Sequence, residues 1–122
     1  MAIYHQRILS FKYAFEGIID AIKEEPNLKF HLLTGLLVIL VGVLLNLSKL
    51  DWVLIIILIG LVISVELTNT AVEAVVDNFT DKTHPGAKMA KDISAGAVLV
   101  VAITSAVAGI IIFLPYLSQG AQ

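Results

Sequence analysis

The sequence predicts an all-α integral membrane protein, with one amphipathic helix at the membrane surface followed by three transmembrane helices. Hydrophobic residues make up 58% of the 122 residues, whereas soluble domains contain roughly 45–50% apolar residues. Three apolar segments follow one another, each close to the ~20 residues that cross a hydrocarbon core of about 30 Å. A chain this short cannot bury so much apolar surface in a core of its own, so lipid is the expected solvent.

The first element is predicted to be an amphipathic helix over about residues 5–25. Its apolar side chains recur at helical spacing, at Ile8, Phe11, Phe15, Ile18, Ile19 and Ile22. Its charged side chains fall on the opposite face, at Lys12, Glu16, Asp20 and Lys23. This pattern is typical of a helix that lies in the membrane interface. Pro26 is expected to end or kink it, because the residue before a proline avoids the α region.

Three transmembrane helices are expected over about residues 29–47, 52–76 and 93–117. The two connections between them are polar and turn-like, and the whole chain, 1–122, is expected to form one membrane domain. The apolar segments contain small residues that allow helices to pack closely. These residues are Gly35, Gly42, Ala102, Ala106 and Gly109.

Positive charges predict the orientation. Of the eight Lys and Arg residues, Lys49 alone lies between the first and second apolar segments, and none follows the third. Because Lys and Arg accumulate on the cytoplasmic side of a membrane, the N-terminus and the 77–92 loop are expected in the cytoplasm and the C-terminus outside. The net charge of −2 argues against a nucleic-acid partner, which calls for a basic face.

Polar side chains line one side of the second apolar segment, in the stretch SVELTNTAVEAVVD (64–77). Within a sector of roughly 100° lie Glu66, Asn69, Thr70, Glu73 and Asp77. At ~1.5 Å per residue, Glu66 lies about 21 Å from Trp52. It is therefore expected near the cytoplasmic side of the hydrocarbon core, with Glu73 and Asp77 at headgroup level. An acid in this position is a functional candidate, whereas an interhelical hydrogen bond remains an open alternative for Asn69.

A second polar cluster begins the third apolar segment, in HPGAKMAKD (84–92). Lys88, Lys91 and Asp92 share a helical face there, although Lys88 also suits simple anchoring on the cytoplasmic side. A lysine near carboxylates that hold Mg²⁺ is suited to a polyphosphate ligand. Helical phase makes Glu25 a better ligand candidate than Glu24. These residues alone do not separate an enzyme from a proton- or cation-coupled carrier, and a purely structural subunit would leave the acids without a role.

Four stretches resemble the small prokaryotic diacylglycerol kinase and undecaprenol kinase family: ELTNTAVEAVVD (66–77), HPGAKMAKDISAGAVL (84–99), FKYAFEGI (11–18) and KEEPNLKFH (23–31). The resemblance extends from about Arg7 to Tyr116, and the IFLPY ending is more similar to the undecaprenol kinase branch. It implies a homotrimeric membrane kinase of the bacterial plasma membrane, with sites shared between subunits. Such an enzyme transfers the γ-phosphoryl group of ATP, with Mg²⁺, to a lipid alcohol. Undecaprenol is the preferred acceptor and diacylglycerol the alternative.

The resemblance also implies a role for each polar residue. Glu66 matches the general base that takes the hydroxyl proton, and Glu25 and Glu73 match the Mg²⁺ ligands. The positions implied to bind ATP are Tyr13, Glu25, Glu73, His84, Lys91 and Asp92. Asn69 and Asp77 match polar positions that line the same site. Lys82 stands where family members often carry an acid, which leaves the contribution of residues 82–83 open.

Overall fold

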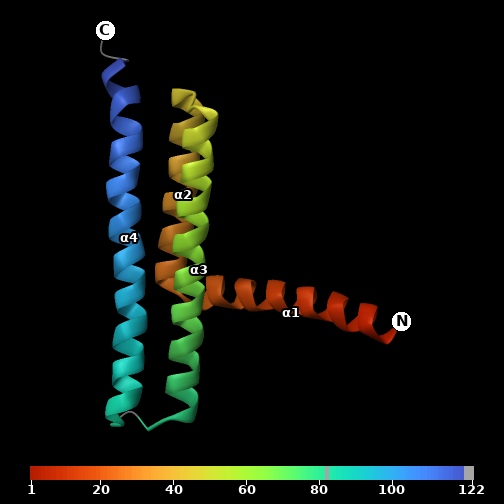
Figure 1. Cartoon of the computed structure of the whole chain (residues 1–122). Coiled ribbons are helices and arrows are strands. Elements are labelled where there is room, and N and C mark those ends of the chain that lie inside the picture. The colour runs from red at the N-terminus through yellow and green to blue at the C-terminus, as the bar shows by residue number, and fades with distance from the viewer. Residues whose placement is uncertain (82, 120–122) are drawn as a thin grey trace.

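The computed structural model describes residues 1–81 and 83–119, and within these ranges it consists of four helices and their connections. The helices are α1 (Ala2–Glu24), α2 (Pro26–Leu45), α3 (Lys49–Phe79) and α4 (Pro85–Gln119). Helices α2, α3 and α4 run side by side, while α1 projects sideways from them (Figure 1). The predicted all-α class is confirmed, and α2, α3 and α4 are each long and apolar enough to cross a membrane. Lys82 lies outside the described residues.

The corner between α1 and α2 is made by two residues. Glu25 has an extended backbone, with φ −107° and ψ 107°, and ends α1. Pro26 is the first residue of α2, where its missing N–H would have no partner within the helix in any case. The predicted break at Pro26 is thus confirmed. Because Glu25 is not helical, however, the helical phase of α1 does not set the direction of its side chain.

A tight turn connects α2 to α3 at the other end of the bundle. Asn46 adopts a left-handed conformation, with φ 53°, which asparagine tolerates better than most residues. Ser48 caps α3, because its hydroxyl accepts a hydrogen bond of 3.2 Å from the backbone N–H of Asp51. Gly42 is buried beneath this turn, and a Cβ there would lie 2.9 Å from both Leu47 and Trp52. The close packing predicted at Gly42 is therefore confirmed.

The small residues predicted in the apolar segments do not all pack closely against another helix of this chain. A Cβ added to Gly35 of α2 would lie 3.2 Å from Ile59 of α3, so these two helices approach closely. A Cβ added to Gly109 would meet nothing within 4 Å. The packing role predicted for Gly109 is thus wrong within this chain, because Gly109 borders a cavity rather than another helix.

α1 meets the bundle part-way along α3 and α4, so that each of these helices has a part on either side of α1 (Figure 1). Toward the connection that joins them, both helices continue past the level of α1 (Figure 1). α1 contacts α2 and also α3, and none of its residues is buried. The polar residues of α3 fall in the part of the helix that starts near this level, which places the candidate site at the junction of α1 with the bundle.

Candidate active site

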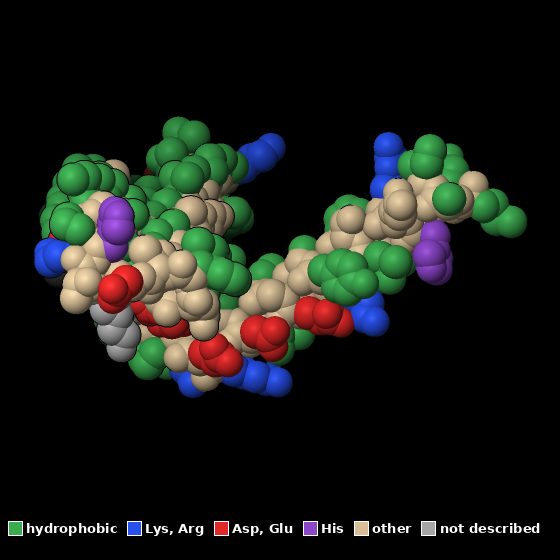
Figure 2. Space-filling view, turned by 90° about the horizontal axis from the view of Figure 1, so that it is seen from below, with side chains coloured by type: hydrophobic (Ala, Val, Ile, Leu, Met, Phe, Trp, Pro, Cys, Tyr) green, Lys and Arg blue, Asp and Glu red, His purple; other side chains and the backbone are tan. Residues whose placement is uncertain are grey.

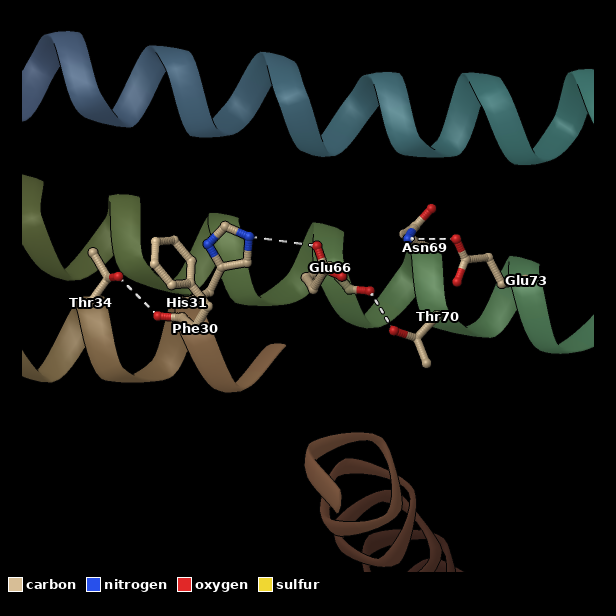
Figure 3. Close-up of polar contacts among 7 residues, drawn as sticks. All are labelled: Phe30, His31, Thr34, Glu66, Asn69, Thr70 and Glu73. Carbon is tan, nitrogen blue, oxygen red and sulfur yellow. Dashed lines mark hydrogen bonds and ion pairs between the residues drawn. The ribbon is translucent and has the colours of Figure 1, made fainter. Parts of the chain in front are cut away.

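The most deeply buried acid is Glu66 of α3, whose side chain is 1% exposed. Its Oε2 lies 3.7 Å from Nε2 of His31, near the start of α2. Figure 3 shows the His31 ring reaching from α2 toward the Glu66 carboxylate. Among the described residues, Oε2 of Glu66 has no hydrogen-bond partner. A buried acceptor without a partner is costly, so this oxygen is suited to receive a proton or a donor from a ligand.

One turn further along α3, Asn69 is also buried, with 6% of its surface exposed. Its Nδ2 donates a hydrogen bond of 3.4 Å to Oε1 of Glu73, while its Oδ1 has no partner among the described residues. The Thr70 hydroxyl donates to the backbone oxygen of Glu66 at 3.0 Å (Figure 3). Thr70 is thus engaged within its own helix, whereas Glu66 and Asn69 each present a free oxygen.

An ion pair joins α3 to α4 near the connection between these two helices. Nζ of Lys91 donates a hydrogen bond of 2.8 Å to Oδ1 of Asp77. Asp92 is paired with Lys88 at 2.6 Å. The two helices enclose a cleft of about 620 Å³ lined by these four side chains together with Asp81.

The remaining predicted site residues lie at the start of α4, along α1 and at the α1–α2 corner, and the structure does not bring Tyr13 of α1 into the lining of this cleft. His84 caps α4, because its Nδ1 accepts hydrogen bonds from the backbone N–H groups of Gly86 and Ala87, at 3.1 and 3.3 Å. Tyr13 is 60% exposed on α1. Glu25 is half-buried at the α1–α2 corner, and its charge, like that of Glu73, acts on Glu66. Viewed from the end of the bundle where α3 is connected to α4, acidic side chains form a row from the bundle onto α1 (Figure 2).

The structure does not gather the predicted Mg²⁺ ligands into a closed cluster. Within residues 1–81 and 83–119, no three His, Asp or Glu side chains lie close enough together to hold a metal ion. Glu73 and Asn69 are nevertheless neighbours on α3, because Oε1 of Glu73 accepts the hydrogen bond from Nδ2 of Asn69. Carboxylate and amide oxygens are ligands that Mg²⁺ accepts alongside phosphate and water, so the chemistry of this donor set fits the ion.

An apolar pocket of about 600 Å³ runs between α2, α3 and α4. Among its lining residues are Thr34, Val62, Ser105, Gly109 and Phe113. His31 also borders it, so this histidine contacts both the pocket and the buried Glu66. Sequence reasoning missed His31. The available signal was a titratable side chain in the first turns of an apolar helix that must pack beside an acidic one.

Known proteins with similar sequences are named as kinases of lipid alcohols. The family model described as prokaryotic diacylglycerol kinase matches residues 12–113. Undecaprenol kinase of Bacillus subtilis (strain 168) is 47% identical over 108 residues, which cover 88% of this chain and 88% of that relative. Diacylglycerol kinase of Synechocystis sp. is 39% identical over 109 residues, covering 88% of this chain and 62% of that relative. Diacylglycerol kinase of Pseudomonas aeruginosa is 34% identical over 85 residues, covering 70% and 69%.

Proposed function

The chain belongs to the prokaryotic diacylglycerol kinase family and is a lipid kinase, and on this premise we propose that it phosphorylates undecaprenol with ATP as the donor. The observation that carries the choice of acceptor is the 47% identity to an undecaprenol kinase along 88% of both chains. The diacylglycerol kinases are 39% and 34% identical. Diacylglycerol is therefore the alternative acceptor.

The apolar pocket is suited to the chain of such a lipid. Its α4 side extends from Ala102 to Leu117, which corresponds to about 22 Å along the helix. A pocket elongated along the bundle and lined almost entirely by apolar side chains favours a hydrocarbon chain over a compact polar ligand. At one end of it His31 contacts Glu66. A lipid lying in the pocket would thus bring its hydroxyl end toward the buried carboxylate.

The cleft between α3 and α4 is suited to the phosphates of ATP. Lys91 and Lys88 both line it, and lysine ammonium groups neutralise the charge of phosphate oxygens. Asp92 lines the cleft and His84 caps the start of α4, in keeping with a role in ATP binding, and we propose the same role for Tyr13, which is exposed on α1. Asp77 holds Lys91 in place through their ion pair. Glu25 and Glu73 would hold Mg²⁺, which when bound neutralises phosphate charge.

The transfer step follows from this arrangement. Glu66 accepts the hydroxyl proton on its carboxylate as the lipid oxygen attacks the γ-phosphorus. The bond between the γ-phosphorus and the oxygen that bridges it to the β-phosphate breaks, which yields the lipid phosphate and ADP. Phosphoryl transfer needs mainly positioning and charge neutralisation. The base must lie where a membrane-bound hydroxyl arrives, and the burial of Glu66 in the part of α3 beside α1 is in keeping with this requirement (Figure 3).

The exposed apolar surface supports a membrane-embedded homotrimer with shared sites. α4 has no buried residue, and large apolar side chains are exposed along α2, α3 and α4. Glu66 and Asn69 are polar groups at membrane depth, where neighbouring helices reduce the cost of exposure to lipid. We propose α1 as the surface helix, on the cytoplasmic side with the 77–92 connection, and the C-terminus outside. The single membrane domain predicted over 1–122 remains part of this proposal.

The acceptor is tested by labelling. Purified protein is given ATP labelled at the γ-phosphate, together with undecaprenol or diacylglycerol in separate mixed micelles at equal mole fraction. We expect faster labelling of undecaprenol. Faster labelling of diacylglycerol would overturn the choice of acceptor while leaving the lipid kinase intact. Labelling of neither lipid would contradict both acceptors.

A further inference from the structure

We propose that His31 is a positioning residue that holds the carboxylate of Glu66 at the end of the apolar pocket, an inference that rests on the proposed function. The juxtaposition that carries it is the approach of Nε2 of His31 to Oε2 of Glu66 at 3.7 Å. The two side chains come from different helices, α2 and α3, and both are largely shielded from solvent, at 16% and 1% exposure.

The charges around Glu66 make His31 distinctive. Among the described groups whose charges act on Glu66, Glu25 and Glu73 are acidic, and His31 alone can carry a positive charge. Oε2 of Glu66 has no hydrogen-bond partner among the described residues, so no other side chain in those ranges determines where this oxygen points. The imidazole is thus the group that can orient it.

The imidazole is itself held in place. Phe30 and His31 stack edge to face, with ring centroids 5.7 Å apart and an interplanar angle of 69°. At 3.7 Å the nitrogen is too far from the carboxylate for a hydrogen bond in this state. Contacts of this kind shorten when substrate completes a site, and a ring N–H donated to one carboxylate oxygen would leave the other free for a proton.

His31 also connects the base to the lipid. It lines the apolar pocket, whereas Glu66 does not, and the ring therefore stands where the pocket ends and the carboxylate begins. Loss of the N–H group should affect the step that involves the lipid hydroxyl and leave ATP binding intact. This gives the role a kinetic signature that a general loss of folding would not produce.

The test uses two substitutions that separate the N–H group from the ring. His31→Gln keeps an N–H donor of similar reach but loses the ring, and His31→Phe keeps a ring that can pack against Phe30 but loses the donor. We expect His31→Phe to lower kcat by roughly 10–100-fold, the scale of a misplaced catalytic group, with the KM for ATP unchanged. His31→Gln should stay within about threefold of the wild-type kcat. His5→Phe and His5→Gln, at an exposed position on α1, are the matched controls.

The opposite order of activities would overturn the inference, since an active His31→Phe protein with an inactive His31→Gln protein means that ring packing alone matters. A second measurement needs no kinase activity. The shift in Tm caused by His31→Phe should be smaller in the Glu66→Gln background than in the wild type, because neighbours in contact are not additive. Equal shifts in both backgrounds overturn the inference alone. A wild-type protein that labels neither lipid overturns the proposed function and the inference with it.

Discussion

Tyr116 of α4 donates its hydroxyl hydrogen to Oδ2 of Asp51 in the first turn of α3, although 65 residues separate them in sequence. The same hydroxyl oxygen accepts a hydrogen bond of 2.9 Å from the backbone N–H of Ser48. Ser48 in turn caps α3 through Asp51. The three residues therefore tie the end of α4 to the α2–α3 turn, at the end of the bundle opposite the candidate active site.

Tyr116→Phe should destabilise the protein without lowering the turnover of folded enzyme. The change removes two hydrogen bonds, one donated to the Asp51 carboxylate and one accepted from the Ser48 N–H, and a bond to a charged group alone contributes about 1.5–3 kcal/mol. A lower Tm in detergent, with unchanged kcat at low temperature, is the expected result. Tyr4→Phe, an exposed tyrosine on α1, is the control. A loss of kcat as large as that of an active-site variant would show that this end of the bundle communicates with the site.

Gly42→Ala should destabilise the α2–α3 hairpin. The new Cβ would lie 2.9 Å from Leu47 and from the Trp52 ring, closer than such atoms pack, and overpacking costs about 1–3 kcal/mol. Gly60→Ala is the matched control, because a Cβ there meets nothing within 4 Å. That control should raise stability by about 0.5–1 kcal/mol, the helix preference of alanine over glycine. Thermal unfolding of both variants in one detergent measures the difference, and equal Tm values would contradict the packing at Gly42.

Glu66→Gln should abolish most lipid phosphorylation while leaving the helices folded. Glutamine keeps the size of the side chain but cannot take the hydroxyl proton, and a general base contributes about 10²–10⁴-fold to rate. Labelled-ATP turnover and circular dichroism together measure the two effects. Glu16→Gln, at an exposed position on α1, is the control. Turnover within a few-fold of wild type would remove Glu66 from the role of base.

Lys91→Met should weaken the use of ATP more than the use of the lipid. The substitution removes a positive charge from the α3–α4 cleft and leaves Asp77 there without its partner. Loss of one group that stabilises transferring oxygens lowers the rate about 10²-fold or more. Steady-state kinetics with each substrate varied in turn should show the loss in kcat/KM for ATP. Lys49→Met, at the opposite end of α3, should behave as wild type, and an equal loss there would indicate a nonspecific charge effect.

Gly109→Phe should fill the apolar pocket. Gly109 lines it, and a Cβ there has open space around it, so the ring enters the cavity without a clash with the backbone. We expect a several-fold higher KM for a long-chain lipid alcohol and an unchanged KM for ATP, as for loss of uniform binding. A lipid alcohol with a short chain should be less affected. An unchanged KM for the long-chain acceptor would show that the chain lies elsewhere.

Helical periodicity predicted which polar residues of this site share a face of one helix, but not which residues of other helices they contact. Glu66, Asn69 and Glu73 were expected on one side of a single helix, and the structure has Asn69 and Glu73 in contact and Glu66 buried one turn away. Pairings between helices were not predictable. Lys88, Lys91 and Asp92 were grouped on one helical face, and Lys88 does pair with Asp92 within α4, but the ion pair of Lys91 with Asp77 of α3 was not predicted.

The sequence by itself determined the four helices, since apolar length, a proline and turn residues act locally. It also determined the family, through motifs that lie within single segments. Tertiary structure decided which side chains face one another across helices: His31 with Glu66, Lys91 with Asp77, and Tyr116 with Asp51. These pairings depend on the rotation and offset of each helix against its neighbours. Packing at positions such as Gly35 and Gly42 sets those quantities, and the periodicity of one helix does not contain them.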